Sequence, residues 1–302
     1  MTTNKRYDVI IIGGSYAGLS AAMALGRSLR NVVVIDSGQP CNQPTPHSHN
    51  FLTQDGSTPA AIATLARQQV EQYKTVHFLD DFATEARKID NGFEITTRSG
   101  QTVTGKKLVL ATGIKDQVPA LPGFAECWGV SLVHCPYCHG YEFRGQPTAI
   151  MANGERAFHL AMLVSNLTGD VTLLPQGKGE ITDEQKTRLG KHNIIIDETE
   201  ITALEHENGQ IKNVVFSNGV KKSFTAVYAA LPFVQHSDIP ASLGCTLTEQ
   251  GHIKTDGQQK TTVPGVFACG DNTSPMRSVA NAVYSGNLTG AVVNRELAEE
   301  AF

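Results

Sequence analysis

The sequence predicts an α/β fold made of two βαβ units, with the second unit inserted between the halves of the first. Two repeats of one pattern and the chain length support this prediction. A short apolar run, a small-residue turn, a helix-forming stretch and a second apolar run follow one another in residues 8–36 and again in residues 148–174. The chain has 302 residues, of which 40% are hydrophobic, and such a length favours two domains over one.

The first unit has the pattern of a dinucleotide-binding site. Residues 8–12 form a continuous apolar run, typical of a buried parallel strand. The glycine turn at residues 13–18 leads into an Ala-rich helix expected over residues 17–29, and the next strand, residues 32–35, ends at Asp36. In this arrangement a pyrophosphate lies at the helix N-terminus, and the acidic side chain reaches a ribose hydroxyl.

Two local features surround this site. Ser15 occupies the middle glycine position of the turn, where its hydroxyl can hydrogen-bond the pyrophosphate. Residues 41–56 are rich in Pro, His and Asn and predict a loop. Within it, His47 and His49 lie near Cys41 and suggest either a metal site or, as the favoured interpretation, loop histidines that line the cofactor or donate hydrogen bonds.

The rest of the first half follows from local patterns. Strand-like alternation, turn residues and a helix cap predict four segments. These are a helix over residues 58–73, a small antiparallel insert over 76–103 with a turn at 90–92, a buried strand over 108–113 that rejoins the first sheet, and a linker over 119–123.

The second βαβ unit has the shape of a dinucleotide site but weaker chemistry. Ala152 stands at the first glycine position, and the second strand ends in Pro175-Gln176-Gly177. This end offers neither an acidic residue for a ribose hydroxyl nor an arginine for a 2′-phosphate. Lys178 and Glu180 lie close by, at a spacing that does not favour them. Binding of NADH or NADPH by this unit is left open.

The remaining stretches complete the predicted organisation. Antiparallel strands are expected over residues 194–224, a strand returning to the first sheet over 227–231, a strand over 263–271, and an amphipathic helix over 278–297. The resulting domains are residues 1–116 and 244–302 for the first domain, and 117–243 for the inserted domain.

Composition argues against several classes of function. The net charge of −4 gives no basis for a nucleic-acid or anionic-membrane partner. No apolar run approaches the ~20 residues of a membrane span. The N-terminus runs directly into the strand expected at residues 7–12, without a signal-peptide core, so a cytoplasmic protein is expected. Six cysteines in a chain of this length are not a secreted disulfide framework.

The stretch of residues 134–142, His-Cys-Pro-Tyr-Cys-His-Gly-Tyr-Glu, carries the chemistry. Cysteines three apart on a helix are neighbours at the separation that a disulfide needs. A thiolate at a helix N-terminus, flanked by His134 and His139, is expected to have a lowered pKa and to be a competent nucleophile. In a reducing compartment such a pair is more often catalytic than structural, which predicts a redox-active pair.

Three other interpretations of this motif stay open at this point. The pattern Cys135-x-x-Cys138-His139 is also that of c-type haem attachment. The cysteines and histidines could hold zinc, although four ligands within six residues crowd one tetrahedral ion, and no metal is predicted. The two thiols could also be buried and unreactive.

Taken together, these motifs resemble the low-molecular-weight thioredoxin reductase group of FAD-dependent pyridine nucleotide–disulfide oxidoreductases. The resemblance covers essentially the full length. It rests on the 13–18 turn with Asp36, Ala111-Thr112-Gly113, Cys135-Pro136-Tyr137-Cys138 at the start of the second domain, the strand at 263–271 and Arg277-Ser278-Val279-Ala280.

The resemblance implies two Rossmann-like domains, one that binds FAD and one that is NAD(P)-binding-like. It also implies a homodimer in which the second domain swings to expose the cysteines. The FAD-binding residues that it implies, of which the last three lie near the isoalloxazine ring, are Gly13, Gly14, Ser15, Ala17, Gly18, Asp36, Ser37, Cys41, Ala111, Thr112, Gly113, Gly270, Asp271, Arg277, Ser278 and Val279.

Three departures from the family leave the electron donor or acceptor open. Ala152 replaces a glycine of the nicotinamide loop, Pro175-Gln176-Gly177 replaces the family's 2′-phosphate signature, and His139 replaces an acidic residue. The Cys-x-x-Cys-His-Gly-Tyr-Glu motif is similar to a branch that includes dithiol oxidases, which pass electrons from FAD to oxygen. NADPH, NADH, ferredoxin and oxygen all remain candidates.

The resemblance also implies roles for the active-site residues. Cys138 faces the flavin, and Cys135 exchanges with a thioredoxin-like protein or a small-molecule dithiol or disulfide. His139 is the expected acid–base group because a histidine titrates near neutral pH, with Glu142 and His134 as second choices. A flavin-binding sensor without turnover is the alternative from another class, and the intact cysteine pair argues against it.

Overall fold

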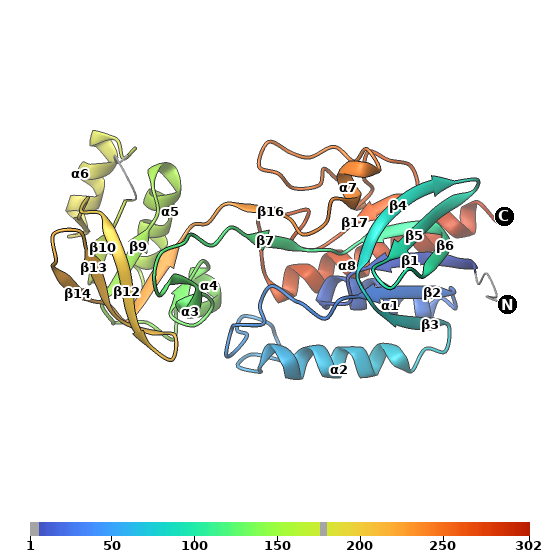
Figure 1. The fold of residues 1–302 in the computed structure, drawn as a ribbon, viewed down its shortest axis with the longest axis horizontal. Helices are drawn as coiled ribbons and strands as arrows, with labels where there is room; N and C mark the ends of the chain where they lie inside the picture. The colour runs from blue at the N-terminus through green and yellow to red at the C-terminus, as the bar shows by residue number, and fades with distance from the viewer. Residues whose placement is uncertain (1–5, 176–179) are drawn as a thin grey trace. The chain divides into compact units, whose positions relative to one another are not determined.

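Contacts divide the chain into two compact units. The computed structural model describes residues 6–175 and 180–302, which Figure 1 colours from blue at the N-terminus to red at the C-terminus. The described parts of the first unit are residues 6–43, 50–115 and 233–302, and those of the second are 44–49 and 116–232 without the gap. Gln176, Gly177 and Lys178, which the sequence analysis considered for the second unit, lie outside the described residues.

A seven-stranded sheet forms the centre of the first unit, in the order β3-β2-β1-β6-β5-β4, with β17 paired to β6. Strands β3, β2, β1, β6 and β17 run parallel, so their carboxyl ends meet at one edge. Strands β4 and β5 add an antiparallel hairpin next to β6. The strands are β1 (Arg6–Ile12), β2 (Val32–Asp36), β3 (Val76–Asp80), β4 (Ala83–Ile89), β5 (Gly92–Thr97), β6 (Thr102–Leu110) and β17 (Val266–Ala268).

The assignment of residues 76–103 to an antiparallel insert is wrong for its first part. Strand β3 pairs parallel with β2, in register from Val32 opposite Val76 to Asp36 opposite Asp80. The connection runs through helix α2 (Pro59–Glu71), and a helical crossover returns the chain in the same direction. Only β4 and β5 form the expected hairpin.

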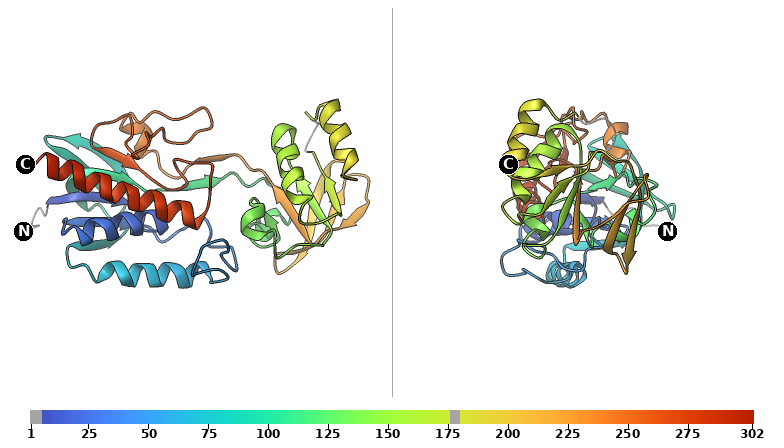
Figure 2. Two further views of the ribbon diagram at one scale, coloured as in Figure 1. Left: turned by 180° about the vertical axis from the view of Figure 1, so that it is seen from behind. Right: turned by 90° about the vertical axis from the view of Figure 1, so that its left-hand side faces the viewer.

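Two long helices fix the position of the glycine turn. Helices α1 (Tyr16–Arg27) and α8 (Val279–Glu299) lie side by side on one face of the sheet (Figure 1 and Figure 2). Their backbones meet closely, because a Cβ added at Gly286 would lie 2.1 Å from the carbonyl oxygen of Ala17. Among residues 6–175 and 180–302, no helix has the length and apolar character needed to cross a membrane.

The second unit contains a parallel five-stranded sheet in the order β11-β10-β9-β15-β8 and an antiparallel sheet β12-β13-β14. The strands are β8 (Leu132–Val133), β9 (Thr148–Met151), β10 (Val171–Leu173), β11 (Ile195–Ile196), β12 (Ile201–Glu207), β13 (Gln210–Phe216), β14 (Lys221–Ser223) and β15 (Ala226–Ala229). The helices are α3 (Phe124–Cys127), α4 (Pro136–His139), α5 (Gly154–Val164) and α6 (Asp183–Lys191).

The prediction that residues 227–231 return to the first sheet is wrong. Strand β15 lies between β8 and β9 of the second unit, with Val227 opposite both Leu132 and Ala149. The apolar run identified a buried strand, but side-chain pattern alone does not choose between two parallel sheets.

The second unit ends at Pro232, before the predicted boundary at 243. Strand β16 (Phe233–Gln235) pairs with β7 (Ile114–Asp116). Helix α7 (Ile239–Ser242) buries Ile239 in the core of the first unit. Burial of this apolar side chain explains why residues 233–243 belong to the first unit.

Candidate cofactor site and candidate active site

The glycine turn after β1 requires glycine for steric reasons. Gly13 has a φ of +103°, and a Cβ there would lie 2.2 Å from the carbonyl oxygen of Ala111. A Cβ at Gly18 would lie 1.8 Å from the carbonyl oxygen of Gly13. The chain therefore passes between β1, β6 and α1 with no room for side chains, which brings backbone N–H groups to the carboxyl edge of the sheet.

The start of α1 is suited to an anion. Ser15 is the N-cap residue, and its side chain makes no capping hydrogen bond to the helix. The N–H groups of the first turn of a helix attract negative charge. Asp36 accepts a hydrogen bond from the Gly14 N–H at 3.0 Å, so the acidic residue and the glycine turn meet as predicted for a ribose and pyrophosphate site.

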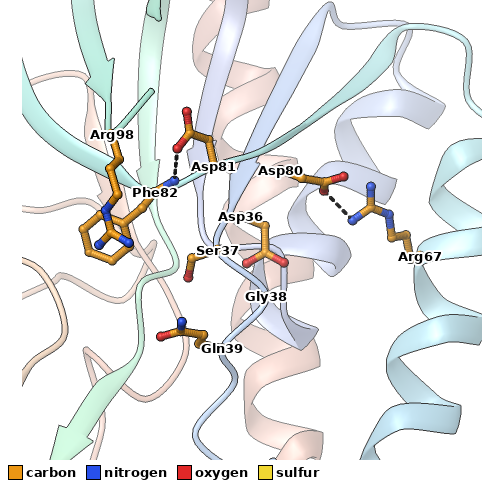
Figure 3. A pocket seen from close by; sticks show the side chains of 9 residues that line it. All are labelled: Asp36, Ser37, Gly38, Gln39, Arg67, Asp80, Asp81, Phe82 and Arg98. Atoms are coloured by element: carbon orange, nitrogen blue, oxygen red, sulfur yellow. Dashed lines mark hydrogen bonds and ion pairs between the residues drawn. The ribbon is translucent and has the colours of Figure 1, made fainter. Parts of the chain in front are cut away.

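A cavity of about 340 Å³ opens at the carboxyl ends of β2 and β3 (Figure 3). Its polar walls fit the nucleoside end of a dinucleotide, because such ligands bind outside the carboxyl ends of parallel strands. Sequence reasoning found Asp36 and Ser37 but missed the walls contributed by other elements, since nothing in the local pattern links them. The lining residues are Asp36, Ser37, Gly38, Gln39, Arg67, Asp80, Asp81, Phe82 and Arg98.

The other predicted cofactor residues gather after β6 and β17. Asn272, which is fully buried, donates hydrogen bonds from Nδ2 to the Leu110 carbonyl at 2.9 Å and to Thr112 Oγ1 at 3.2 Å. Next to it, Asp271 Oδ2 lies 3.8 Å from Arg277 Nε and 3.8 Å from Cys41 Sγ. The structure therefore brings Thr112, Asp271, Arg277 and Cys41 into one neighbourhood.

This neighbourhood also holds polar atoms that a ligand could satisfy. Within the described residues, Asn272 Oδ1 and the Nε2 atom of buried His252 have no hydrogen-bond partner. Buried polar groups normally have such partners, so these atoms fit a polar cofactor at this place. Neither residue is predicted from the sequence motifs, although Asn272 directly follows Gly270 and Asp271.

The cysteine pair lies at the start of α4, as the motif predicted. Cys135 is the N-cap residue, and its Sγ accepts a hydrogen bond from the Cys138 N–H at 3.1 Å. The two cysteines form a disulfide with a Cα–Cα separation of 5.3 Å. The interpretation as two buried free thiols is therefore wrong. In the described part of the chain, no group of three or more His, Cys, Asp or Glu side chains is arranged to hold a metal.

The other cysteines are poorly suited to redox chemistry. Burial raises the pKa of Cys127 to about 11 and that of Cys269 to about 12, so both stay protonated at neutral pH. Burial also raises the pKa of Cys245. Cys41 is exposed but lies beside Asp271 in the cofactor neighbourhood.

His139 does not titrate as expected. Burial disfavours its charged form, the charge of His49 acts in the same direction, and Glu142 opposes them, so the pKa of His139 is lowered from 6.5 to about 4. The expectation that His139 titrates near neutral pH is therefore wrong. At neutral pH it is a neutral imidazole, which can accept a proton but does not carry a second proton to donate.

The carboxylate of Glu142 interacts electrostatically with His49, His139 and Tyr228. Its Oε1 atom lies 3.7 Å from His49 Nε2. Its charge also adds to burial in raising the pKa of Tyr228, whose hydroxyl is buried. His134 lies on the other side of the disulfide in sequence, with its ring 6.1 Å from that of Trp128.

The N-terminus of α5 offers poorer conditions for a pyrophosphate. Asn153 Oδ1 accepts hydrogen bonds at 2.9 Å from the N–H groups of Gly154 and Glu180. The Glu180 side chain lies next to Gly154, since a Cβ added there would be 3.3 Å from Glu180 Oε2. Glu155 occupies the first turn. Carboxylates at this helix end compete with a phosphate for the same partial positive charge.

Comparison with known proteins places the chain among flavin enzymes. The signature of the family described as pyridine nucleotide-disulphide oxidoreductase matches residues 7–286. Thioredoxin reductase aclD of Aspergillus oryzae is 34% identical over 304 residues, which cover 97% of this chain and 96% of the relative. The solved structure of an oxidoreductase from Agrobacterium tumefaciens is 34% identical with a TM-score of 0.92, covering 98% and 99% of the two chains. A putative thioredoxin reductase TrxB from Bacillus anthracis is 28% identical with a TM-score of 0.93, covering 98% and 100%.

The chain therefore belongs to the pyridine nucleotide-disulphide oxidoreductase family. Within it, the protein is a thioredoxin reductase-like, FAD-dependent disulfide oxidoreductase. The predicted α/β fold with two Rossmann-like domains is confirmed.

Proposed function

We propose that the enzyme relays two electrons between FAD and a substrate dithiol or disulfide through Cys135 and Cys138. The observation that supports this most is the bonded pair at the start of α4, next to exposed Tyr137. A disulfide at such a position is open to attack by a substrate thiolate. The buried cysteines offer no comparable route.

FAD is proposed to bind the first unit through the residues that the resemblance implied, with Asn272 and His252 added. When bound, FAD supplies a reversible acceptor and donor of two electrons. The first turn of α1 would hold the pyrophosphate, and Asp36 the ribose.

Each chemical step on the protein sulfurs is a thiol–disulfide exchange. A substrate thiolate attacks Cys135 Sγ, the Cys135–Cys138 bond breaks, and its electron pair remains on Cys138. The second substrate thiolate then displaces Cys135 from the mixed disulfide. The substrate leaves as a disulfide, and both protein sulfurs are reduced. Reduction of a substrate disulfide runs through the same steps in reverse.

Anaerobic mixing of the yellow protein with dithiothreitol tests this relay. The wild type should lose its flavin absorbance, whereas Cys138→Ser and Cys135→Ser should keep FAD bound and stay yellow. Dithionite should bleach all three proteins, which controls for a reducible flavin. Bleaching of Cys138→Ser by dithiothreitol at the wild-type rate would exclude the relay.

A second candidate is a dithiol oxidase that passes its electrons to oxygen rather than exchanging them with NAD(P)H. The carboxylates of Glu155 and Glu180 at the N-terminus of α5 favour this direction. NADPH and NADH, added separately without oxygen, should then leave the flavin oxidised, while a dithiol bleaches it and air restores the colour. Rapid bleaching by either nicotinamide would instead support a reductase fed by that donor.

The substrate and assembly remain proposals as well. The name of the A. oryzae relative supports a thioredoxin-like protein as partner, and the dithiol-oxidase candidate favours a small molecule. The resemblance further supports a homodimer, and a cytoplasmic location is the expectation from the sequence. Sedimentation equilibrium of the holoenzyme would then give twice the chain mass of 32.5 kDa, and the single mass would contradict the dimer.

A further inference from the structure

A loop of residues 37–43 follows β2 and joins two parts of the candidate cofactor site. Its first residues line the cavity at the carboxyl ends of β2 and β3 (Figure 3). Further along the loop, Cys41 Sγ lies 3.8 Å from Asp271 Oδ2, in the neighbourhood after β17. The whole loop belongs to the first unit, so its position bears directly on how that unit holds a ligand.

Tyr16 fixes the end of this loop through its hydroxyl. It is the first residue of α1 and is only 8% exposed. Its ring belongs to the buried core of the first unit, as does Ile62 of α2. The hydroxyl accepts a hydrogen bond from Asn42 Nδ2 at 3.2 Å and donates one to the Pro59 carbonyl at 3.3 Å. A ring that is held in the core thus presents a hydroxyl that acts as both donor and acceptor.

The hydrogen bond between Tyr16 and Asn42, the loop anchor, lies at the start of α1. The same helix start is the proposed site of the pyrophosphate, because the N–H groups of the first turn attract negative charge. A loop that is already held in place loses less conformational entropy when a ligand binds against it. A ligand held by such a loop therefore escapes less readily.

We propose that Tyr16 and Asn42 are positioning residues for FAD, and that the loop anchor slows the release of the bound cofactor. The proposal rests on the proposed placement of FAD in the first unit and is independent of the relay through the cysteines. Tyr16 lies between Ser15 and Ala17, which the resemblance implies as FAD-binding residues, but it is not one of them. It acts through Asn42 and the loop and needs no contact of its own with the cofactor.

Two variants separate the loop anchor from the packing of α1 against α2. Tyr16→Phe removes the hydroxyl and with it both hydrogen bonds. Asn42→Ala removes only the bond to the loop and leaves the bond to the Pro59 carbonyl in place. If the loop anchor governs the release of FAD, both variants release it faster. If the packing of the helices governs it, Asn42→Ala behaves as the wild type.

The test is the rate at which the holoenzyme exchanges its bound FAD for added isotope-labelled FAD. The protein stays loaded throughout, and the exchange reports the dissociation of FAD without any turnover. Tyr16→Phe and Asn42→Ala should each exchange FAD about tenfold faster than the wild type, the effect expected for the loss of one hydrogen bond. The double variant should exchange FAD at the rate of Tyr16→Phe alone, because the loop anchor is already absent there.

Tyr73→Phe is the matched control, since it removes a tyrosine hydroxyl that accepts a hydrogen bond from Arg27 Nη1 at 3.2 Å, beyond the C-terminal end of α2. It should exchange FAD at the wild-type rate. Wild-type exchange in Asn42→Ala would overturn the proposal. So would faster exchange in Asn42→Ala if its apoprotein also unfolded at a lower temperature, because a general loss of stability would then explain the result. Unchanged FAD affinity in Asp36→Ala would instead show that the proposed placement of FAD is wrong.

Discussion

The lowered pKa of His139 makes the stability of the second unit sensitive to acid. In the unfolded chain this histidine binds its proton near 6.5, whereas in the folded protein it does so at about 4. Between these values the unfolded state holds the additional proton, so acidification favours unfolding. The contribution is fully present above pH 6.5 and is lost as the pH falls towards 4.

The magnitude follows from the difference between the two pKa values. One pKa unit corresponds to about 1.4 kcal/mol, which sets an upper value of about 3 kcal/mol for a shift from 6.5 to about 4. The ring is only partly enclosed, and screening by water lowers the expected effect to roughly 2 kcal/mol. Replacement of His139 by Gln removes the titrating group and should remove this part of the acid sensitivity.

Trp128, the only tryptophan of the chain, lies in the second unit and reports its unfolding. Urea titrations of the oxidised holoenzyme between pH 7.5 and 4.5 would follow its fluorescence. Wild type should lose roughly 2 kcal/mol more than His139→Gln over this interval, and the control His159→Gln, at an exposed position on α5, should behave as the wild type. Parallel pH dependences of wild type and His139→Gln would refute the assignment of a neutral, partly enclosed imidazole.

Two further predictions concern the cofactor site. Gly286→Ala places a methyl group 2.1 Å from the Ala17 carbonyl oxygen and should destabilise the first unit by about 3 kcal/mol, measured as a lower temperature of flavin release. The control Gly257→Ala adds a methyl group in open space and should leave that temperature unchanged. Equal temperatures of flavin release for the two variants would contradict the close packing of α1 against α8. Asp36→Ala removes the acceptor of the Gly14 N–H and should weaken FAD binding about tenfold, measured by titrating the apoprotein with FAD; unchanged affinity would exclude Asp36 from the site.

The local sequence pattern predicts those parts of the fold and of the site in which residues close in sequence are also close in space. The first βαβ unit could be predicted because strand, glycine turn, helix and Asp36 follow one another directly. The Cys135–Cys138 pair could be predicted for the same reason, since residues three apart meet on one helical turn.

Long-range pairing and electrostatics could not be predicted in this way. β3 and β15 were recognised as strands but assigned to the wrong partners, because an apolar run does not name its neighbour in a sheet. The pKa of His139 depends on burial and on His49, which lies far away in sequence. Asn272 and His252 likewise become notable only once folding buries their polar atoms.

The central claim is that Cys135 and Cys138 exchange electrons with FAD. Anaerobic titration with dithionite, followed by flavin absorbance and counted thiols, tests it directly. Wild type should take up twice as many electrons per flavin as the Cys135→Ser/Cys138→Ser double variant. The reason is that wild type accepts one electron pair on FAD and a second pair, passed on from FAD, on the disulfide. Equal electron uptake by the two proteins, with the wild-type disulfide still closed, would contradict it.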